Sequence, residues 1–225
     1  MRSVAIRAGI AAAIAIAGFA IAVAALNATL YSPVGFVQGY LDALQQRDAA
    51  AALEIAGAPP SSSRRADLLQ DAAISPGVIR EVVAGDEVDG VVPVTVTFDA
   101  AGRTSTANFE VLRGGSLLGL FSSWSFLQSP LATVEITVLN ANSFTANGLD
   151  LRTVQQNSPV RYLVFSPGVL VLEHRSDLLV ADPETVVIDQ PGPIIAELRA
   201  SASEAFIAQV QEQTDAYLAD CATQQ

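Results

Sequence analysis

Cysteine and histidine are almost absent from this sequence, which contains one of each among 225 residues. Cys221 has no second cysteine for an intramolecular disulfide, and by itself it cannot build a cysteine-based metal site. His174, in "LEHRSD", could act as a general base, but no serine or cysteine motif supplies a nucleophile for it to activate. It stands at the end of a β-like segment, where we expect a residue exposed to solvent.

Positive charge is also scarce, since twelve arginines and no lysine stand against 23 acidic residues. Arg2 and Arg7 precede every acid, so from residue 32 onward ten arginines face 23 acids, a net charge of −13. Such a surface repels phosphate backbones and anionic lipid headgroups. The composition therefore argues against nucleic-acid binding, and the sequence has no basic stripe with interleaved aromatic residues.

A long segment without charge begins at Ala8 and continues to Leu41. Its first 19 residues, 8–26, are ten alanines, seven larger apolar residues and two glycines. As a helix this stretch would be about 28 Å long, close to the ~30 Å hydrocarbon core of a bilayer. We expect a single membrane helix over residues 8–30. The short basic segment 1–7 would lie in the cytoplasm, and the acidic body would lie on the other side of the membrane.

A cleaved signal peptide is the main alternative for this segment. The basic start, the apolar stretch and Ala22-Val23-Ala24 fit the small-x-small cleavage pattern. A buried helix of a soluble protein is the third possibility. In the first two cases the body is exported, and a lipoprotein is excluded because no cysteine lies near the end of the apolar segment to carry the lipid.

Helix signals follow directly on the apolar segment. Ser32-Pro33 combines an N-cap residue with proline at the first helical position. One apolar stripe at spacings of three and four residues then predicts a helix, and its members are Val34, Val37, Leu41 and Leu44. Asp48 is expected to cap a second, alanine-rich helix, which the turn residues of "GAPPSSS" end. A third short helix is predicted from Arg64 to Ala73.

From Val78 the hydrophobic period changes from helical to alternating. One face of the expected second strand carries Val92, Val94, Val96 and Phe98. "DAAGR" and "RGG" are the expected hairpin tips, and on a later strand Trp124 and Phe126 share a face that closes the core. Helices followed by antiparallel strands predict an α+β domain over residues 32–128, with the helices on one face of the sheet.

A second set of β-like segments starts after Ser129-Pro130. These segments run from "ATVEITVLN" to "ETVVID", are separated by Asn-Gly, Ser-Pro-Gly and Asp-Pro turns, and predict a small β module over residues 131–198. Ser201-x-x-Glu204 is a capping-box pattern that predicts a C-terminal helix over residues 201–225. The residues expected near one face of this helix are Leu198, Ala202, Phe206, Val210, Leu218 and Cys221.

The order of proline, amphipathic helix, "YLDALQQRDAAAAL" and hairpins that end in a tryptophan-containing strand resembles the cone-shaped NTF2-like fold. From Pro33 to Cys221 the chain resembles the extracytoplasmic part of TcaA-type bacterial membrane proteins, although the cytoplasmic zinc ribbon of many such proteins is absent. The resemblance implies a membrane-anchored envelope protein whose first exported domain begins a few residues from the bilayer.

The resemblance also bears on the C-terminal helix. Its "YL…C" pattern, at Tyr217, Leu218 and Cys221, resembles the helix that opens a further NTF2-like domain in such proteins. The resemblance thus implies that this helix is the orphaned first element of a missing domain, and docking of the helix on the β module or on the cone is the alternative.

Few residues are candidates for chemistry. Enzymes of the NTF2-like fold place an acid and a tyrosine in an apolar pocket, so the resemblance makes Tyr40, Asp42 and Trp124 the candidate pocket residues. Tyr40 and Asp42 are two apart on a helix, about 200° around its axis, so at most one of them faces a pocket.

Two glycine-bounded motifs could suggest other chemistry. "GDEVDG", residues 85–90, lacks the distal glutamate of a calcium loop, and "GGSLLG", residues 114–119, lacks the Gly-x-Ser-x-Gly pattern of a nucleophile elbow. Both are expected to be hairpin turns.

These observations predict a non-catalytic, membrane-anchored, extracytoplasmic module of the bacterial cell envelope. It is expected to contact another envelope protein or a cell-wall component, with no catalytic residue, metal or cofactor. A small-molecule-binding or enzymatic NTF2-like domain that uses the cone pocket is the alternative. The two differ in whether the cone interior is open and lined by polar groups or is filled by side chains.

Overall fold

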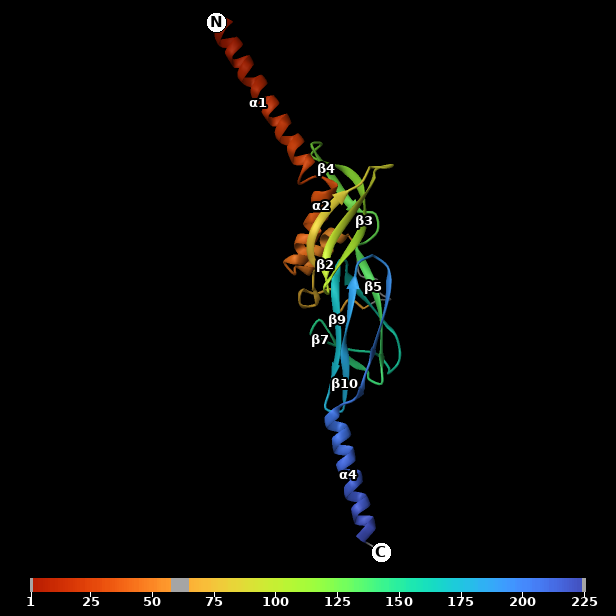
Figure 1. The fold of residues 1–225 in the computed structure, drawn as a ribbon. Coiled ribbons are helices and arrows are strands. Elements are labelled where there is room, and N and C mark those ends of the chain that lie inside the picture. The colour runs from red at the N-terminus through yellow and green to blue at the C-terminus, as the bar shows by residue number, and fades with distance from the viewer. Residues whose placement is uncertain (1, 58–64, 224–225) are drawn as a thin grey trace.

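The computed structural model describes residues 2–57 and 65–223, with side chains from residue 13 onward. Figure 1 shows an elongated molecule in which a single helix projects from each end of a β-rich body. These end helices are α1 (Arg2–Ala28) and α4 (Glu204–Thr223). The chain is α+β, as predicted. The side chains of Arg2 and Arg7, in the expected cytoplasmic stub, lie outside the described part.

The first part of the body is two helices against a four-stranded antiparallel sheet of order β1-β2-β3-β4. The helices are α2 (Pro33–Gln45) and α3 (Ala49–Ala56), and the strands are β1 (Val78–Ala84), β2 (Val91–Ala100), β3 (Arg103–Leu117) and β4 (Phe121–Phe126). Both predicted caps are confirmed: Ser32 Oγ accepts a hydrogen bond from Gly35 N, and Asp48 Oδ1 accepts one from Ala51 N, each at 2.9 Å. Gly57 ends α3 in a left-handed conformation, and the rest of "GAPPSSS" lies outside the described residues.

One of the two predicted hairpin tips of this sheet is wrong. The turn between β2 and β3 falls at Ala101-Gly102, within "DAAGR", as expected. The sequence "RGG", residues 113–115, however, lies inside β3, and the chain turns three residues after it, at Leu118-Gly119. The glycines form an irregularity in the pairing of β3 with β4, between Arg113 and Ser116, and a β-bulge accommodates them without ending the strand.

The second part of the body contains eight strands in two sheets. The order β11-β5-β8 joins β5 (Leu131–Leu139), β8 (Val160–Phe165) and β11 (Pro193–Arg199). The order β12-β10-β9-β6-β7 joins β6 (Ser143–Ala146), β7 (Leu149–Arg152), β9 (Gly168–Arg175), β10 (Leu179–Ile188) and β12 (Ser201–Ala202). All pairings are antiparallel except that of β11 with β5. The predicted Asp-Pro turn is instead a bulge within β10, between Ala181 and Glu184.

The predicted third helix does not form in the described residues. Its first residue, Arg64, lies outside them, and only a 3-10 turn, η1 (Asp71–Ala73), is helical. Arg65 N donates to Arg161 O at 3.0 Å, and Leu163 N donates to Arg65 O at 2.9 Å, so the chain pairs with β8 at this point. Tertiary pairing with a distant strand has overridden the local helical pattern.

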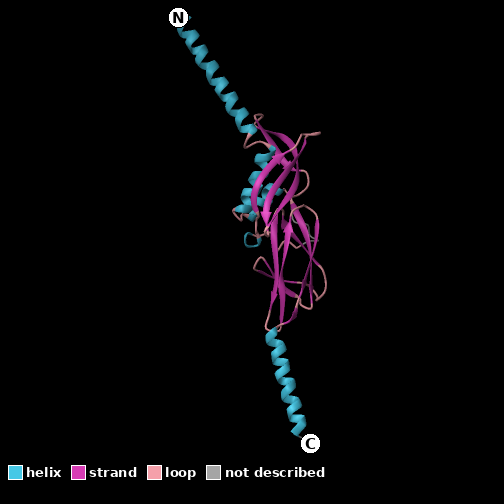
Figure 2. Cartoon of the chain, in the orientation of Figure 1, coloured by secondary structure: helices cyan, strands magenta, loops and turns pink. Residues whose placement is uncertain are grey.

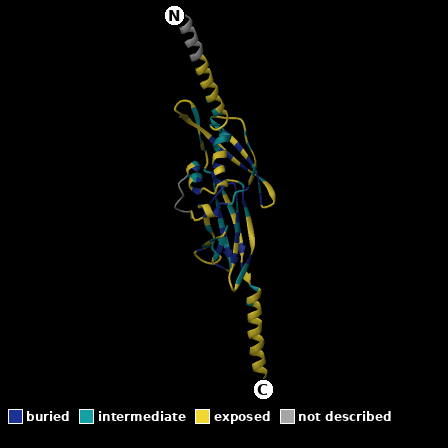
Figure 3. Ribbon diagram, turned by 90° about the vertical axis from the view of Figure 1, so that its left-hand side faces the viewer, coloured by how far each residue is buried: buried dark blue, intermediate teal, exposed yellow. Residues whose placement is uncertain are grey.

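Two hydrophobic cores meet along residues 65–75, the connecting segment between α3 and β1. Leu68 belongs to the core between the two sheets of the β module, whereas Leu69 belongs to the core between the helices and the first sheet. Phe165 of β8 and Val187 of β10 also pack into the first core. Figure 3 shows buried positions inside both parts of the body and exposed positions along both end helices. The two parts of the body therefore share an interface built from apolar side chains.

The C-terminal helix begins later than its sequence pattern predicts. Ser201 and Ala202 form β12 and pair with β10, and Ser203 caps α4 by accepting from Phe206 N at 3.1 Å. Leu198 and Ala202 are thus strand residues and do not lie on the helix face, contrary to expectation. None of the residues of α4 is buried, and the helix projects away from the sheets (Figure 2).

The N-terminal helix is exposed on all sides over most of its described length. Every residue from Ala13 to Ala22 is exposed, including Ile14 and Ile21 at 67 % and 70 %. Within the part of the chain that the structure describes, no helix by itself has the length and apolar character of a membrane span. Two consecutive helical segments, Ala13–Ala28 and Pro33–Gln45, are bent by 58° at the break between them. Taken together, this pair is long and apolar enough for a membrane span.

Candidate functional sites

A cluster of aromatic side chains packs around Tyr40 in the core between the helices and the first sheet. The Tyr40 ring is fully buried and meets the Phe126 ring edge-on, with ring centroids 5.3 Å apart. The centroid of the Phe126 ring lies 5.0 Å from that of Phe36 and 5.6 Å from that of Phe109. The Tyr40 hydroxyl donates to Ser166 O at 2.9 Å. Burial raises the pKa of Tyr40 far above its ordinary value. This phenol is a neutral donor that joins α2 to the β module.

The three candidate pocket residues point to three different places. Tyr40 is buried, whereas Asp42 lies on the exposed face of α2, in agreement with the helical geometry. Trp124 is half-buried near the end of α1, where its Nε1 donates to Tyr31 O at 2.8 Å and the Arg113 guanidinium lies 4.6 Å from its ring centroid. The fold therefore does not bring an acid to the tyrosine.

His174 is buried, so the prediction of an exposed histidine is wrong. Only 6 % of its surface is accessible, because β9 places residues 170, 172 and 174 on its inner face by the two-residue period of a strand. His174 Nδ1 lies 2.7 Å from Ser143 O, and since a carbonyl can only accept, Nδ1 carries the proton. His174 thus holds β6 against β9, and its Nε2 lies 3.4 Å from Ser176 Oγ.

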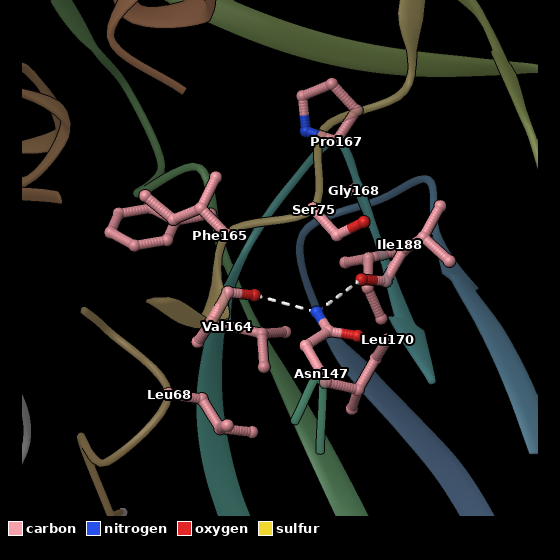
Figure 4. Close-up of a pocket in the computed structure, with 12 residues that line it drawn as sticks. Leu68, Ser75, Asn147, Val164, Phe165, Pro167, Gly168, Leu170 and Ile188 are labelled. Atoms are coloured by element: carbon pink, nitrogen blue, oxygen red, sulfur yellow. Dashed lines mark hydrogen bonds between the residues drawn. The ribbon is translucent and has the colours of Figure 1, made fainter. Parts of the chain in front are cut away.

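A cavity of about 20 Å³ lies where the connecting segment meets β9, and it can hold about one water molecule. Asn147 closes one side of it (Figure 4). The Asn147 Nδ2 donates to Ala73 O at 2.7 Å and to Val169 O at 2.9 Å, while its Oδ1 accepts from Val171 N at 2.8 Å. The amide is fully used in joining three backbone segments, so this cavity is a feature of packing.

Several open grooves on the surface are larger than this cavity, among them two that are mainly polar and include charged side chains. One, of about 670 Å³, lies between the outer face of β2 and β3 and the loop after β10, and its charged residues are Glu110 and Asp189. The other, of about 440 Å³, crosses β6, β7 and β9, and its lining includes Asp150, Arg152, Glu173, His174 and Arg175. The serine beside the His174 imidazole, Ser176, uses its hydroxyl in the turn between β9 and β10, where Oγ donates to Leu179 O at 3.1 Å and accepts from Leu179 N at 3.0 Å.

The acidic loop "GDEVDG" joins β1 to β2, as its turn residues predict. Glu87 pairs with Arg113, with Oε2 and Nη2 2.6 Å apart, and this hydrogen bond holds the pKa of Glu87 below its ordinary value. Among the described residues, no group of three histidine, cysteine or acidic side chains is placed to hold a metal ion. The loop is thus a polar connection tied to β3.

The end of α1 is locked to the β3–β4 hairpin, which sequence reasoning did not anticipate. Asn27 Nδ2 donates to Leu120 O and Asn27 Oδ1 accepts from Ser122 N, both at 2.8 Å. The Tyr31 ring stacks on Phe121, with centroids 4.5 Å apart. Asn27 is the first polar side chain after the apolar residues 8–26. Its position there is the feature of the sequence that could have indicated a contact at the end of α1.

A comparison with protein-family models, with curated proteins and with solved structures finds no match to this chain.

Proposed function

We propose that the chain is a membrane-anchored, non-catalytic module of the bacterial cell envelope. In this proposal α1 crosses the membrane with the N-terminus in the cytoplasm, and the body lies outside. There it contacts another envelope protein or a cell-wall component.

The observation that carries the proposal is the exposure of α1. A helix that is apolar on every side is normally enclosed by protein or by lipid. The exposed residues of α1 include Ile14, Ile16, Phe19 and Ile21, each at 59 % or more, and Figure 1 shows the helix projecting from the body. Leaving such side chains in water costs about 25 cal/mol for each Å² of apolar surface. A bilayer removes this cost, and Arg2 and Arg7 favour a cytoplasmic N-terminus.

We infer further that residues 32–128 are a variant of the NTF2-like fold. Two helices packed on one face of a four-stranded antiparallel sheet, with a tryptophan in the last strand, support this inference. In such a fold the pocket would lie between the helices and the sheet, where aromatic side chains pack around Tyr40. This packing favours a binding module over the pocket-based alternative.

A topology reporter tests the anchoring. A reporter that is active only in the cytoplasm is fused to the C-terminus of the full chain, and a second fusion carries a reporter active only outside it. We expect activity from the second fusion alone. Activity of the cytoplasmic reporter would contradict the proposal, and release of a soluble body would indicate signal-peptide cleavage instead of anchoring.

In-cell photo-crosslinking tests the binding role. Ile195 of β11 is 79 % exposed, so a photo-reactive residue at this position reports on contacts of the β module, and mass spectrometry identifies the product. We expect an adduct with an envelope protein or a cell-wall fragment, formed in cells and lost when the chain is produced without α1. A small molecule that copurifies with the chain, without any adduct, would favour the pocket-based alternative.

A further inference from the structure

The β3–β4 hairpin ends in an exposed cluster of leucines beside the last turns of α1. Leu117, Leu118 and Leu120 are exposed by 53 %, 83 % and 42 %, and Leu30, in the linker after α1, by 69 %. Asn27 binds the backbone of this hairpin on both sides of Phe121, and Figure 1 shows the tip next to the end of α1. Adjacent exposed leucines of this kind mark a surface that interacts with an apolar partner.

The hairpin reaches well beyond the rest of its sheet. The last residue of β3 that pairs with β2 is Leu112, opposite Val91, so residues 113–117 continue for roughly 16 Å without β2 beside them. Arg113 N donates to Gly90 O at 2.8 Å, which places the acidic loop at the base of this extension. The carboxylates of that loop are therefore separated from the leucine tip by the length of the extension.

The extension has the composition of a membrane-interface segment. No charged residue occurs from Gly114 to Trp124. Trp124 lies at the base of the extension, opposite Arg113, whereas Phe121 lies at its tip, opposite Leu117, and stacks on Tyr31. Tryptophan and tyrosine are enriched where hydrocarbon meets headgroups. Arg113, which stacks on Trp124 and pairs with Glu87, is the cation at this level.

The place at which the hairpin contacts α1 determines which part of a membrane the leucine tip would reach. Between Ala13 and Ala28 the partly covered residues of α1 are Val23, Leu26 and Asn27, which share one helical face near the C-terminal end. The hairpin is bonded to this end through Asn27. If residues 8–26 cross the bilayer, the tip lies at the depth at which α1 leaves the outer leaflet.

We propose that the tip of the β3–β4 hairpin, residues 117–121, inserts into the outer-leaflet interface beside α1. This proposal rests on the membrane anchoring of α1 proposed above. The body then meets the membrane at two points, α1 and the leucine tip, and Asn27 fixes the angle between them. Insertion relies on apolar contact, because the acidic body gains no attraction from anionic lipids.

Depth-dependent quenching tests the insertion with the full chain in phosphatidylcholine vesicles. Cys221→Ser removes the native thiol, and Leu118→Cys then carries an environment-sensitive fluorophore at the tip. Ala101→Cys is the matched control, since Ala101 is also exposed, also precedes a glycine at a hairpin tip, and has a φ of 50° against 53° for Leu118. The same dye is used at both positions, so its own affinity for lipid cancels.

We expect lipids with a nitroxide near the headgroup to remove most of the fluorescence at position 118 and little of it at position 101. Ile14→Cys, labelled in the same way, reports on α1 alone and should be quenched by nitroxides placed deep in the bilayer. A quenched label at 14 with an unquenched label at 118 would overturn the hairpin proposal and leave the anchor standing. Labels at 14 and 118 that both stay unquenched would overturn the anchor, and the hairpin proposal with it.

Discussion

At the scale of single residues, the role that the structure supports for Tyr40 is to join the two parts of the body through a buried hydrogen bond. Its hydroxyl is the donor for the buried Ser166 carbonyl, and Ser166 Oγ is itself buried, with no hydrogen-bond partner among the residues that the structure describes. We expect Tyr40→Phe to lower the free energy of unfolding by about 1–2 kcal/mol, because a buried carbonyl loses its donor. Urea unfolding of the full chain in mild detergent measures this difference.

Tyr217→Phe is the matched control for that substitution. Tyr217 is 69 % exposed on α4, so the same chemical change removes no buried hydrogen bond there and should leave stability unchanged. Equal effects of the two substitutions would contradict the role assigned to the Tyr40 hydroxyl.

The raised pKa of Tyr40 also predicts a loss of stability at alkaline pH. The folded phenol keeps its proton while the unfolded one releases it above its ordinary pKa of about 10, so the unfolded state binds fewer protons there. Stability is therefore full below about pH 10 and falls as the pH rises through that value, by up to about 1.4 kcal/mol per pH unit for one group. The fall should be shallower in Tyr40→Phe, where the remaining part comes from Tyr162, whose pKa burial also raises. Parallel curves for the two proteins would refute this explanation.

At the scale of elements, the entry of the chain into α2 depends on the absence of a side chain at Gly35. A Cβ at this position would lie 2.3 Å from Thr29 O and 2.7 Å from Leu30 O, which are backbone atoms of the α1–α2 linker. We expect Gly35→Ala to push the linker away from α2 and to lower the melting temperature, at a cost of about 1–3 kcal/mol. Strain at this place should also weaken the contact of Asn27 with the hairpin.

Gly39, one turn later in α2, offers the matched control. Apart from the backbone of α2 itself, no described atom lies within 4 Å of a Cβ there, so Gly39→Ala gains helix propensity without a clash and should stabilise the protein by about 0.5–1 kcal/mol. Thermal unfolding of both variants, followed by circular dichroism, checks the opposite signs. A melting temperature for Gly35→Ala equal to that of Gly39→Ala would show that the linker yields freely.

Asn147 is a second residue whose side chain affects how elements are held together. Asn147, in the turn between β6 and β7, donates to the connecting segment at Ala73 O and to β9 at Val169 O, and it accepts from β9 at Val171 N. Asn147→Ala removes all three hydrogen bonds, and we expect a loss of about 2 kcal/mol or more in the free energy of unfolding. Asn157→Ala serves for comparison, because Asn157 has a similar left-handed φ, 59° against 48°, but is exposed and accepts one hydrogen bond. Urea unfolding separates the two, and an equal loss would attribute the effect to backbone conformation alone.

At the scale of the whole molecule, the sequence predicts what is local and misses what joins distant segments. Ser32, Asp48 and the apolar stripe of α2 act within a few residues, so caps, helices and the α+β class follow from pattern alone. The connecting segment 65–75 and Asn27 bond to partners more than 70 residues away, which no short-range period reveals. The opposite placement of Tyr40 and Asp42 was predictable from helix geometry, whereas the contacts of Trp124 with Tyr31 were not.

The elongated shape gives the last prediction, which concerns α4. Its 20 residues bury no side chain, and its apolar residues include Ile207, Val210 and Leu218 at 44–58 % exposure. Most of the stability of a helix in a protein comes from packing of its apolar face, which α4 lacks, so its amides should exchange within the time in which those of α2 stay protected. Hydrogen exchange with mass spectrometry on the dilute full chain compares the two helices directly. Strong protection across residues 206–218 in the monomer would mean that α4 docks on the body. Protection that rises with protein concentration would instead mean that a second copy covers the apolar stripe.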